Sequence, residues 1–267
     1  MNYLVISPYY PQNFQQFTIE LANKGITVLG IGQEPYEQLD EPLRNSLTEY
    51  FRVENMEDLE EVKRAAAFLF YKHGPIDRIE SHNEYWLELD AALREQFNVF
   101  GAKPKDLKKT KFKSEMKKLF KKAGVPVVPG AVVKAEKDID KAVKKIGLPL
   151  IAKPDNGVGA AATFKIETPE DVERFKAEWD GHTEYFFEKF VLSSEICTFD
   201  GLVDRDGNIV FSTTFDYAYT PLDLMLYKMD NSYYVLKEMD PKLRQYGEAI
   251  VKAFGMKERF FHIEFFR

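Results

Sequence analysis

The first hundred residues combine short apolar runs with segments whose apolar residues recur at helical spacing. Continuous apolar runs are typical of strands buried on both faces, and glycines such as Gly25 and Gly74 are common helix stops. The two patterns alternate, with strands expected at 2–8, 26–32 and 76–81 and helices at 12–25, 55–74 and 84–97. Because strand, helix and strand units of this kind form parallel sheets, residues 1–102 are predicted to form a small doubly wound α/β domain.

The composition changes at residue 103, where ten lysines fall within 103–122. Phe112, Met116, Leu119 and Phe120 recur at helical spacing, which predicts one cationic helix ending at Gly124. A solvated helix surface is the simplest interpretation. Nucleic acid is not expected as a partner, because exposed aromatic residues are not interleaved with the lysines and the net charge of the chain is -6.

The rest of the chain mixes further helices and strands. Helices are expected at 137–147, 168–179 and 240–255, and strands at 149–153, within 184–215 about the turn 204–208, and at 259–267. Thr168 and Asp171 suit a capping box at the start of one helix. In the last strand, alternation places His262, Glu264 and Phe266 on one face.

The stretch "LPLIAKPDNGVGAAATFKI", residues 148–166, is the first with recognisable chemistry. Its small residues let the backbone approach a ligand closely, so that amide groups can converge on an anion: Gly157, Gly159, Ala160, Ala161 and Ala162. Lys153 ends an apolar strand, where a cation usually meets a negative partner. Phosphate is the natural ligand, although a hairpin turn explains the letters "DNG" equally well. The spacing matches neither the P-loop nor the dinucleotide fingerprint.

Two charges, Glu188 and Lys189, lie within the apolar run "YFFEKFVL". An edge strand with outward charges is the plain alternative to a functional role. The lone cysteine, Cys197, excludes an internal disulfide and is expected to be a small buried residue.

Four stretches in order resemble the ATP-grasp superfamily, most closely its carboxylate-amine ligase-like members with a domain similar to the large subunit of carbamoyl-phosphate synthase. They are "KSEMKKLFKKAGVPVVP", "LPLIAKPDNGVGAAA", "EKFVLSSE" and "FFHIEFFR". Each motif is loose, but their order and spacing are specific. The resemblance covers essentially the whole chain and implies a preATP-grasp domain over 1–102, followed by an α+β ATP-grasp domain with subdomains at 103–185 and 186–267.

The resemblance also implies roles for single residues. Lys113 and Lys153 correspond to nucleotide-binding lysines, with Lys153 at the α-phosphate and the loop of Gly157, Gly159, Ala160 and Ala161 closing over the phosphates. The remaining positions follow the family in order: Glu188, Lys189 and Val191 at the adenine, Glu195 at the ribose, and Glu264 as a Mg²⁺ ligand. Lys153 and Arg267 are the catalytic candidates.

Members of this family use ATP and Mg²⁺ to convert a carboxylate into an acyl phosphate, which an amine or similar nucleophile attacks. The resemblance therefore implies a ligase for small-molecule carboxylate and amine substrates. The family completes its metal site on a second strand, and this sequence stops at Arg267 before such a segment, which leaves the second subdomain incomplete. The expectation is a truncated part of a longer ligase, and the alternative is a non-catalytic module that binds ATP or ADP in the same cleft.

Other features of the sequence concern the cellular location, the oligomeric state and the substrate. The start of the chain lacks a basic region and a cleavage site, and no run of eighteen apolar residues occurs, so a cytoplasmic protein without a membrane partner is expected. The oligomeric state is not determined, and a homodimer stays open. Asn83 and Glu84 follow a predicted strand where a substrate enters such sheets, but a helix start explains them more simply. A loop over 216–227, with Asp216, Tyr217, Tyr219 and Asp223, is either substrate-reading or aromatic packing.

Overall fold

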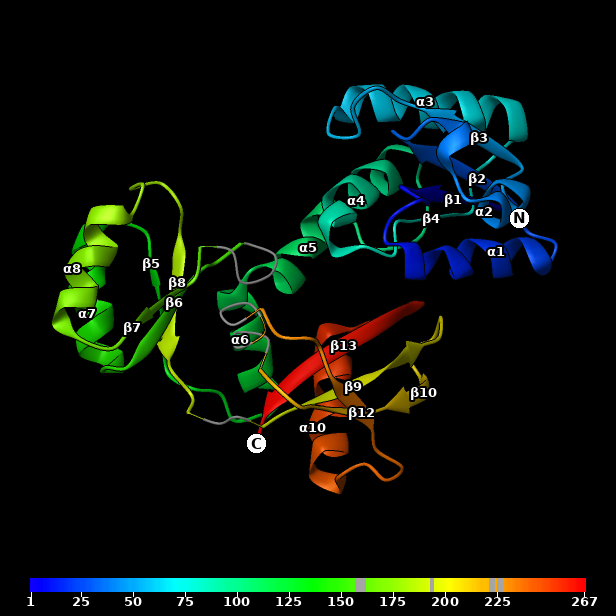
Figure 1. The fold of residues 1–267 in the computed structure, drawn as a ribbon. Coiled ribbons are helices and arrows are strands. Elements are labelled where there is room, and N and C mark those ends of the chain that lie inside the picture. Colours follow the sequence, from blue (N-terminus) through cyan, green and yellow to red (C-terminus); the bar gives the residue numbers. More distant parts are fainter. Residues whose placement is uncertain (157–161, 193–194, 221–223, 225–227) are drawn as a thin grey trace. The chain divides into compact units, whose positions relative to one another are not determined.

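The computed structural model describes residues 1–156, 162–192, 195–220, 224 and 228–267. This part of the chain forms two compact units, Met1–Leu107 and Lys108–Arg267 (Figure 1). Among the helices in these ranges, none combines the length and the hydropathy needed to cross a lipid bilayer.

The first unit is a parallel sheet with helices on both faces. Its strands, in the spatial order β3-β2-β1-β4, are β1 (Asn2–Ile6), β2 (Thr27–Gly32), β3 (Glu49–Arg52) and β4 (Arg78–Glu80). Its helices are α1 (Gln15–Asn23), α2 (Glu41–Ser46), α3 (Leu59–His73) and α4 (Leu87–Gln96), with short 3-10 turns η1 (Gln12–Phe14), η2 (Tyr36–Gln38) and η3 (Glu84–Trp86). The predicted doubly wound α/β class is confirmed.

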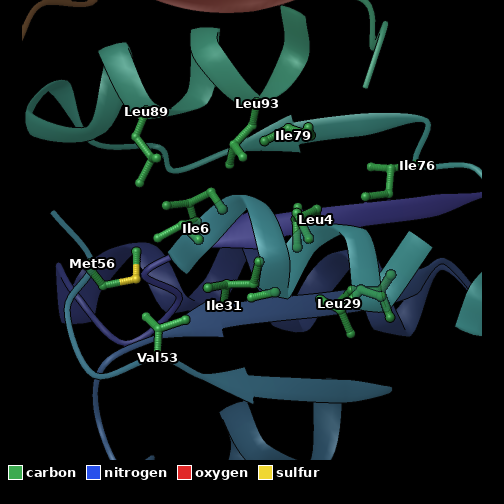
Figure 2. Packing of buried hydrophobic residues seen from close by; sticks show 14 of the residues in the cluster. Leu4, Ile6, Leu29, Ile31, Val53, Met56, Ile76, Ile79, Leu89 and Leu93 are labelled. Carbon is green, nitrogen blue, oxygen red and sulfur yellow. The ribbon is translucent and has the colours of Figure 1, made fainter. Parts of the chain in front are cut away.

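The apolar runs of β1 and β2 are continuous because both faces of this sheet are covered. Leu4 and Leu29 point to the face that α4 covers with Leu93, as Figure 2 shows. Val5 and Val28 point to the opposite face and pack with Leu43 of α2 and its neighbours. One strand therefore contributes to two cores.

The sequence pattern did not predict β3, whose four residues have charged ends. Tyr50 of β3 lies across the neighbouring strand, and a Cβ built on Gly32 would lie 2.4 Å from the Tyr50 hydroxyl. At the carboxyl end of β4, the Asn83 side chain accepts a hydrogen bond of 2.9 Å from the Tyr85 amide. The simpler interpretation of Asn83, as the start of a helical turn, is confirmed.

The second unit begins with α5 (Pro104–Lys111), whose end crosses into it, and α6 (Lys113–Lys122). The expectation of one continuous cationic helix is wrong, because Phe112 between them is extended (φ −87, ψ 118). Phe112 forms a β-bridge with Asn156 instead. The break arises from a strand distant in sequence, so the helical spacing of Phe112, Met116 and Leu119 could not reveal it.

The second unit contains two antiparallel sheets. The small sheet has the order β5-β8-β6-β7 and consists of β5 (Gly130–Val133), β6 (Leu150–Pro154), β7 (Phe164–Ile166) and β8 (Tyr185–Lys189). Helices α7 (Glu136–Ile146) and α8 (Pro169–Glu178) cover one of its faces (Figure 1). The predicted capping box at α8 is confirmed, because Thr168 accepts from the Asp171 amide and Asp171 accepts from the Thr168 amide.

The large sheet consists of β9 (Ile196–Val203), β10 (Ile209–Thr213), β11 (Phe215–Tyr217), β12 (Tyr233–Val235) and β13 (Arg259–Phe266). β9 pairs with β13 along its whole length, and α10 (Pro241–Phe254) packs on one face through a core that includes Phe199, Phe254 and Ile263. Cys197 lies in this core and is buried as expected. The predicted alternation in β13 is confirmed, since Phe261 and Ile263 are buried while His262 and Glu264 face outward.

Candidate functional site

Lys113 and Lys153, far apart in sequence, belong to two elements that are joined where β6 ends and α6 begins. The Lys113 amide donates to the Asp155 carbonyl at 3.0 Å, and its ammonium donates to the Pro154 carbonyl at 2.8 Å. The buried Asp155 carboxylate accepts from the Ser114 amide at 2.8 Å and from the Ser114 hydroxyl at 2.6 Å. Asp155 therefore caps α6 from another element and holds the start of α6, with Lys113, against the end of β6, which carries Lys153.

Glu188 lies beside Lys153 on the face of the small sheet opposite α7 and α8. The Lys153 ammonium donates to Oε1 of Glu188 at 2.9 Å. A second ammonium, that of Lys117 on α6, lies 2.6 Å from Oε2. Burial alone would raise the pKa of Glu188, but the attraction and hydrogen bonds of Lys153 and Lys117 outweigh it and lower that pKa.

The sequence reasoning missed Lys117 and Asp155. Lys117 lies one helical turn after Lys113, so its position on the same helix face was the available signal. Asp155 stands directly after the "KP" of β6, but its role as a cap depends on a tertiary contact. The pattern alone could assign neither residue.

The edge-strand interpretation of Glu188 and Lys189 is wrong, because β8 lies between β5 and β6. Lys189 points to the helix-covered face, where its ammonium donates to the Leu148 carbonyl at 2.8 Å, just beyond the end of α7. Cations are favourable at helix C-termini, which accounts for this contact. Val191 is half-buried and Glu195 is exposed. Gly157, Gly159, Ala160 and Ala161 lie outside the described residues, as does Asp223.

Glu264 belongs to a polar cluster on the face of the large sheet opposite α10. His262 lies between two carboxylates, with Nδ1 2.5 Å from Oδ1 of Asp200 and Nε2 3.5 Å from Oε1 of Glu264. These hydrogen bonds, first that of Asp200 and then that of Glu264, raise the pKa of His262 to about 10 against the opposing effect of burial. The cluster therefore concentrates negative charge around one imidazolium.

Arg267 lies at the end of β13 beside a cavity of about 210 Å³. Its guanidinium donates to Oδ2 of Asp216 at 2.8 Å, and its amide donates to the Glu195 carbonyl at 3.1 Å. Tyr217 follows Asp216 in β11, and burial followed by the nearby Glu264 raises the pKa of its hydroxyl. The structure thus brings Asp216, Glu195 and Arg267 together.

Comparison with known proteins matches residues 112–220 to the family of the carbamoyl-phosphate synthase L chain, ATP binding domain. The L-arginine-specific L-amino acid ligase of Bacillus subtilis is 28% identical over 224 residues, which cover 80% of this chain and 53% of that protein. The matched family segment contains both lysines and Glu188.

Two solved structures share the fold. The L-amino acid ligase of Bacillus licheniformis superposes with a TM-score of 0.74 at 17% identity, covering 98% of this chain and 64% of that one. The biotin carboxylase domain of the 2-oxoglutarate carboxylase of Hydrogenobacter thermophilus, solved as a dimer with MgADP, ADP and bicarbonate, has a TM-score of 0.72 at 19% identity and covers 99% of this chain and 60% of that one.

The present chain thus spans about half of its curated relative, 53%, and under two thirds of these two structures. The family match covers the lysine-bearing segments, and the fold likeness extends over both units. Residues 112–220 are thus similar to an ATP-binding domain of the carbamoyl-phosphate synthase type, and the chain has the fold of ATP-grasp ligases.

Proposed function

We propose that this chain is the nucleotide-binding part of an ATP-dependent ligase that joins a carboxylate to an amine or similar nucleophile. One observation carries the proposal: Asp155 and Pro154 hold Lys113 beside the end of the strand that carries Lys153, directly before the small residues of 157–161 in the sequence. Two cations next to such a loop suit a polyphosphate. The likeness to an amino acid ligase and to a biotin carboxylase supports the same class of reaction.

The proposed reaction has two steps. A carboxylate oxygen attacks the γ-phosphorus of ATP and the bond to the β,γ-bridging oxygen breaks, which yields an acyl phosphate and ADP. The nucleophile then attacks the acyl carbon, phosphate leaves, and the attacking nitrogen loses a proton. Lys113 and Lys153 contribute by neutralising the charge that develops on the phosphates and by aligning them. The loop residues Gly157, Gly159, Ala160 and Ala161 would exclude water from the acyl phosphate.

We propose further contacts for the adenine, the ribose and the transferred phosphoryl group. The end of β8 and the residues after it bind the adenine through Glu188 and through the backbone of Lys189 and Val191, since the Lys189 ammonium is already held at the end of α7. Glu195 contacts the ribose. Arg267 acts on the transferred phosphoryl group once its ion pair with Asp216 opens.

Mg²⁺ is the metal that this chemistry requires. Within the described residues, no group of three or more His, Cys, Asp and Glu side chains is arranged to hold a metal ion. Glu264 and Asp200 nevertheless offer hard carboxylate oxygens on one sheet face, and Mg²⁺ is commonly held by one or two carboxylates, substrate phosphates and water. These two residues would hold the ion once the His262 ring leaves the space between them, and the bound ion would neutralise phosphate charge.

A second candidate is a module that binds ATP or ADP without turnover. The imidazolium of His262 favours it, because this cation already occupies the space between Asp200 and Glu264. Formation of ADP in the presence of candidate amino acids would exclude this alternative.

A homodimer is also proposed, and the mass of the chain in solution tests it.

Calorimetric titration with a non-hydrolysable ATP analogue and Mg²⁺ tests nucleotide binding directly. We expect saturable binding that weakens about tenfold or more in Lys153→Ala, which corresponds to about 1.4 kcal/mol or more. Lys141→Ala on the exposed side of α7 is the matched control and leaves the affinity unchanged. Absence of saturable binding to the unaltered chain would contradict the proposal.

A further inference from the structure

The Glu188 carboxylate is shared between two ammonium groups. Lys153 reaches Oε1 from the adjacent strand β6, and Lys117 reaches Oε2 from α6. Only 14% of the Glu188 side chain is exposed. A carboxylate removed from water to this degree needs at least one cation to keep its charge.

A nucleotide would compete for one of these two cations. If Lys153 contacts a phosphate, its ammonium must leave Glu188 wholly or in part. Removing the sole partner of a buried charge is strongly unfavourable, so a phosphate would bind poorly if Lys153 alone compensated Glu188. The second ammonium removes this obstacle, because Glu188 keeps one charge-assisted hydrogen bond when Lys153 turns away.

The surroundings of the two lysines differ in a way that suits such an exchange. The Lys117 ammonium also donates to the Val128 carbonyl at 3.4 Å and lies 5.8 Å from the centre of the Phe186 ring. Lys153 stands next to Pro154, whose carbonyl is held by the Lys113 ammonium. Three groups therefore hold the Lys117 ammonium: the Glu188 carboxylate, the Val128 carbonyl and the Phe186 ring. Lys153, in contrast, lies next to the residues where the proposed phosphate site begins.

We propose that Lys117 is a positioning residue for nucleotide binding: it retains Glu188 while Lys153 moves from that carboxylate to a phosphate. This inference rests on the proposed function, and it assigns Lys117 no contact with the nucleotide itself. It predicts that Lys117 matters for ligands with phosphates and not for ligands without them.

The test is a calorimetric titration of the full chain with ADP and Mg²⁺ and, separately, with adenosine. Lys117→Met should weaken ADP binding about tenfold and leave adenosine binding unchanged, because adenosine does not draw Lys153 from Glu188. Lys117→Arg should bind both ligands like the unaltered chain. Lys118→Met, at a neighbouring position whose side chain is 69% exposed, is the matched control and should change neither affinity.

A second substitution isolates the mechanism. Glu188→Gln removes the buried charge, so adding Lys117→Met to Glu188→Gln should cause no further loss of ADP affinity. A direct contact of Lys117 with a phosphate would instead make the double variant about tenfold weaker than Glu188→Gln. If Lys117→Met does not fold, the other variants still test the expectation, since Lys117→Arg should bind ADP like the unaltered chain and the double variant like Glu188→Gln.

The outcomes separate the two proposals. If the unaltered chain binds ADP and Lys117→Met binds it equally well, the exchange is overturned while nucleotide binding stands. Equal weakening of ADP binding and adenosine binding would indicate that Lys117 has only a structural role, and it would also overturn the exchange. Failure of the unaltered chain to bind ADP would overturn the proposed function and this inference with it.

Discussion

Ser114 and Asp155 are joined twice: the Ser114 hydroxyl donates to one carboxylate oxygen of Asp155 at 2.6 Å, and the Ser114 amide donates to the other at 2.8 Å. Asp155 is 2% exposed, so these bonds are shielded from water. The Asp155 amide donates to the Glu184 carbonyl at 2.8 Å, which extends the connection to the residue before β8. One aspartate thus links α6, which carries Lys113, to both strands that carry Lys153 and Glu188.

Asp155→Ala should therefore destabilise the second unit by on the order of 3 kcal/mol, because a helix cap is lost and the half-buried Ser114 donors lose their acceptor. Urea unfolding followed by Trp179 fluorescence in a Trp86→Phe background measures this. Binding of the ATP analogue should weaken as well, since Lys113 and Lys153 lose their common support. Asp171→Ala, which removes one of the two bonds of the capping box of α8, should leave that binding unchanged, and equal effects of the two variants would contradict the assigned role.

A pH dependence is expected in the first unit from Asp90. Burial, opposed by Arg94 and reinforced by Glu80, raises the pKa of Asp90 from 3.8 to about 6. The folded state therefore binds this proton more tightly than the unfolded state. The stabilisation from Asp90 is complete below about pH 4 and is lost as the pH rises through 6, by on the order of 2–3 kcal/mol.

The measurement is the free energy of unfolding between pH 4 and 7, followed by Trp86 fluorescence in a Trp179→Phe background. Asp90→Asn is the matched variant, because its amide nitrogen can replace Oδ1, which has no hydrogen-bond partner, while its amide oxygen accepts from Ser81. The difference in unfolding free energy between the unaltered chain and the Asp90→Asn variant should change with pH in the stated direction. Parallel curves would show that Asp90 does not titrate in this range.

Gly247 provides a prediction that opposes helix propensity. Alanine in the middle of a helix is usually about 1 kcal/mol better than glycine. In α10, however, a Cβ at Gly247 would lie 2.2 Å from the ring of Phe199, which is fully buried. Gly247→Ala should therefore destabilise the second unit by about 1–3 kcal/mol.

The cause can be checked with Phe199→Leu, which removes the ring that the new Cβ would meet. The double variant should be more stable than the sum of the two single effects implies, with a coupling of about 1 kcal/mol. Urea unfolding gives the free energy of unfolding of the unaltered chain, the two single variants and the double variant. A stabilising Gly247→Ala would refute the close approach of α10 to β9.

The sequence predicted those parts of the fold that depend on local pattern. The strands β1, β2 and β13 and the helices α3, α8 and α10 follow from apolar spacing and from caps such as Thr168 and Gly255. β3 and the break at Phe112 did not follow, because each depends on a partner distant in sequence. For the site, the family resemblance pointed to Lys113, Lys153 and Glu188, but their mutual contacts depend on Asp155 and Lys117, whose roles are tertiary.

Cys197 offers a final test, because it is the single cysteine of the chain and lies within the core of the large sheet. Burial raises the pKa of its thiol, against the opposing effect of the Arg267 guanidinium. Only the thiolate reacts with alkylating reagents, so burial and the raised pKa both slow the reaction. At pH 8 the folded chain should be modified at least about a hundredfold more slowly than the chain in concentrated urea. The modification rate against urea concentration then reports opening of the second unit, and Cys197→Ser gives the background. Rapid modification of the folded chain would mean that β9 is not covered by α10 as described.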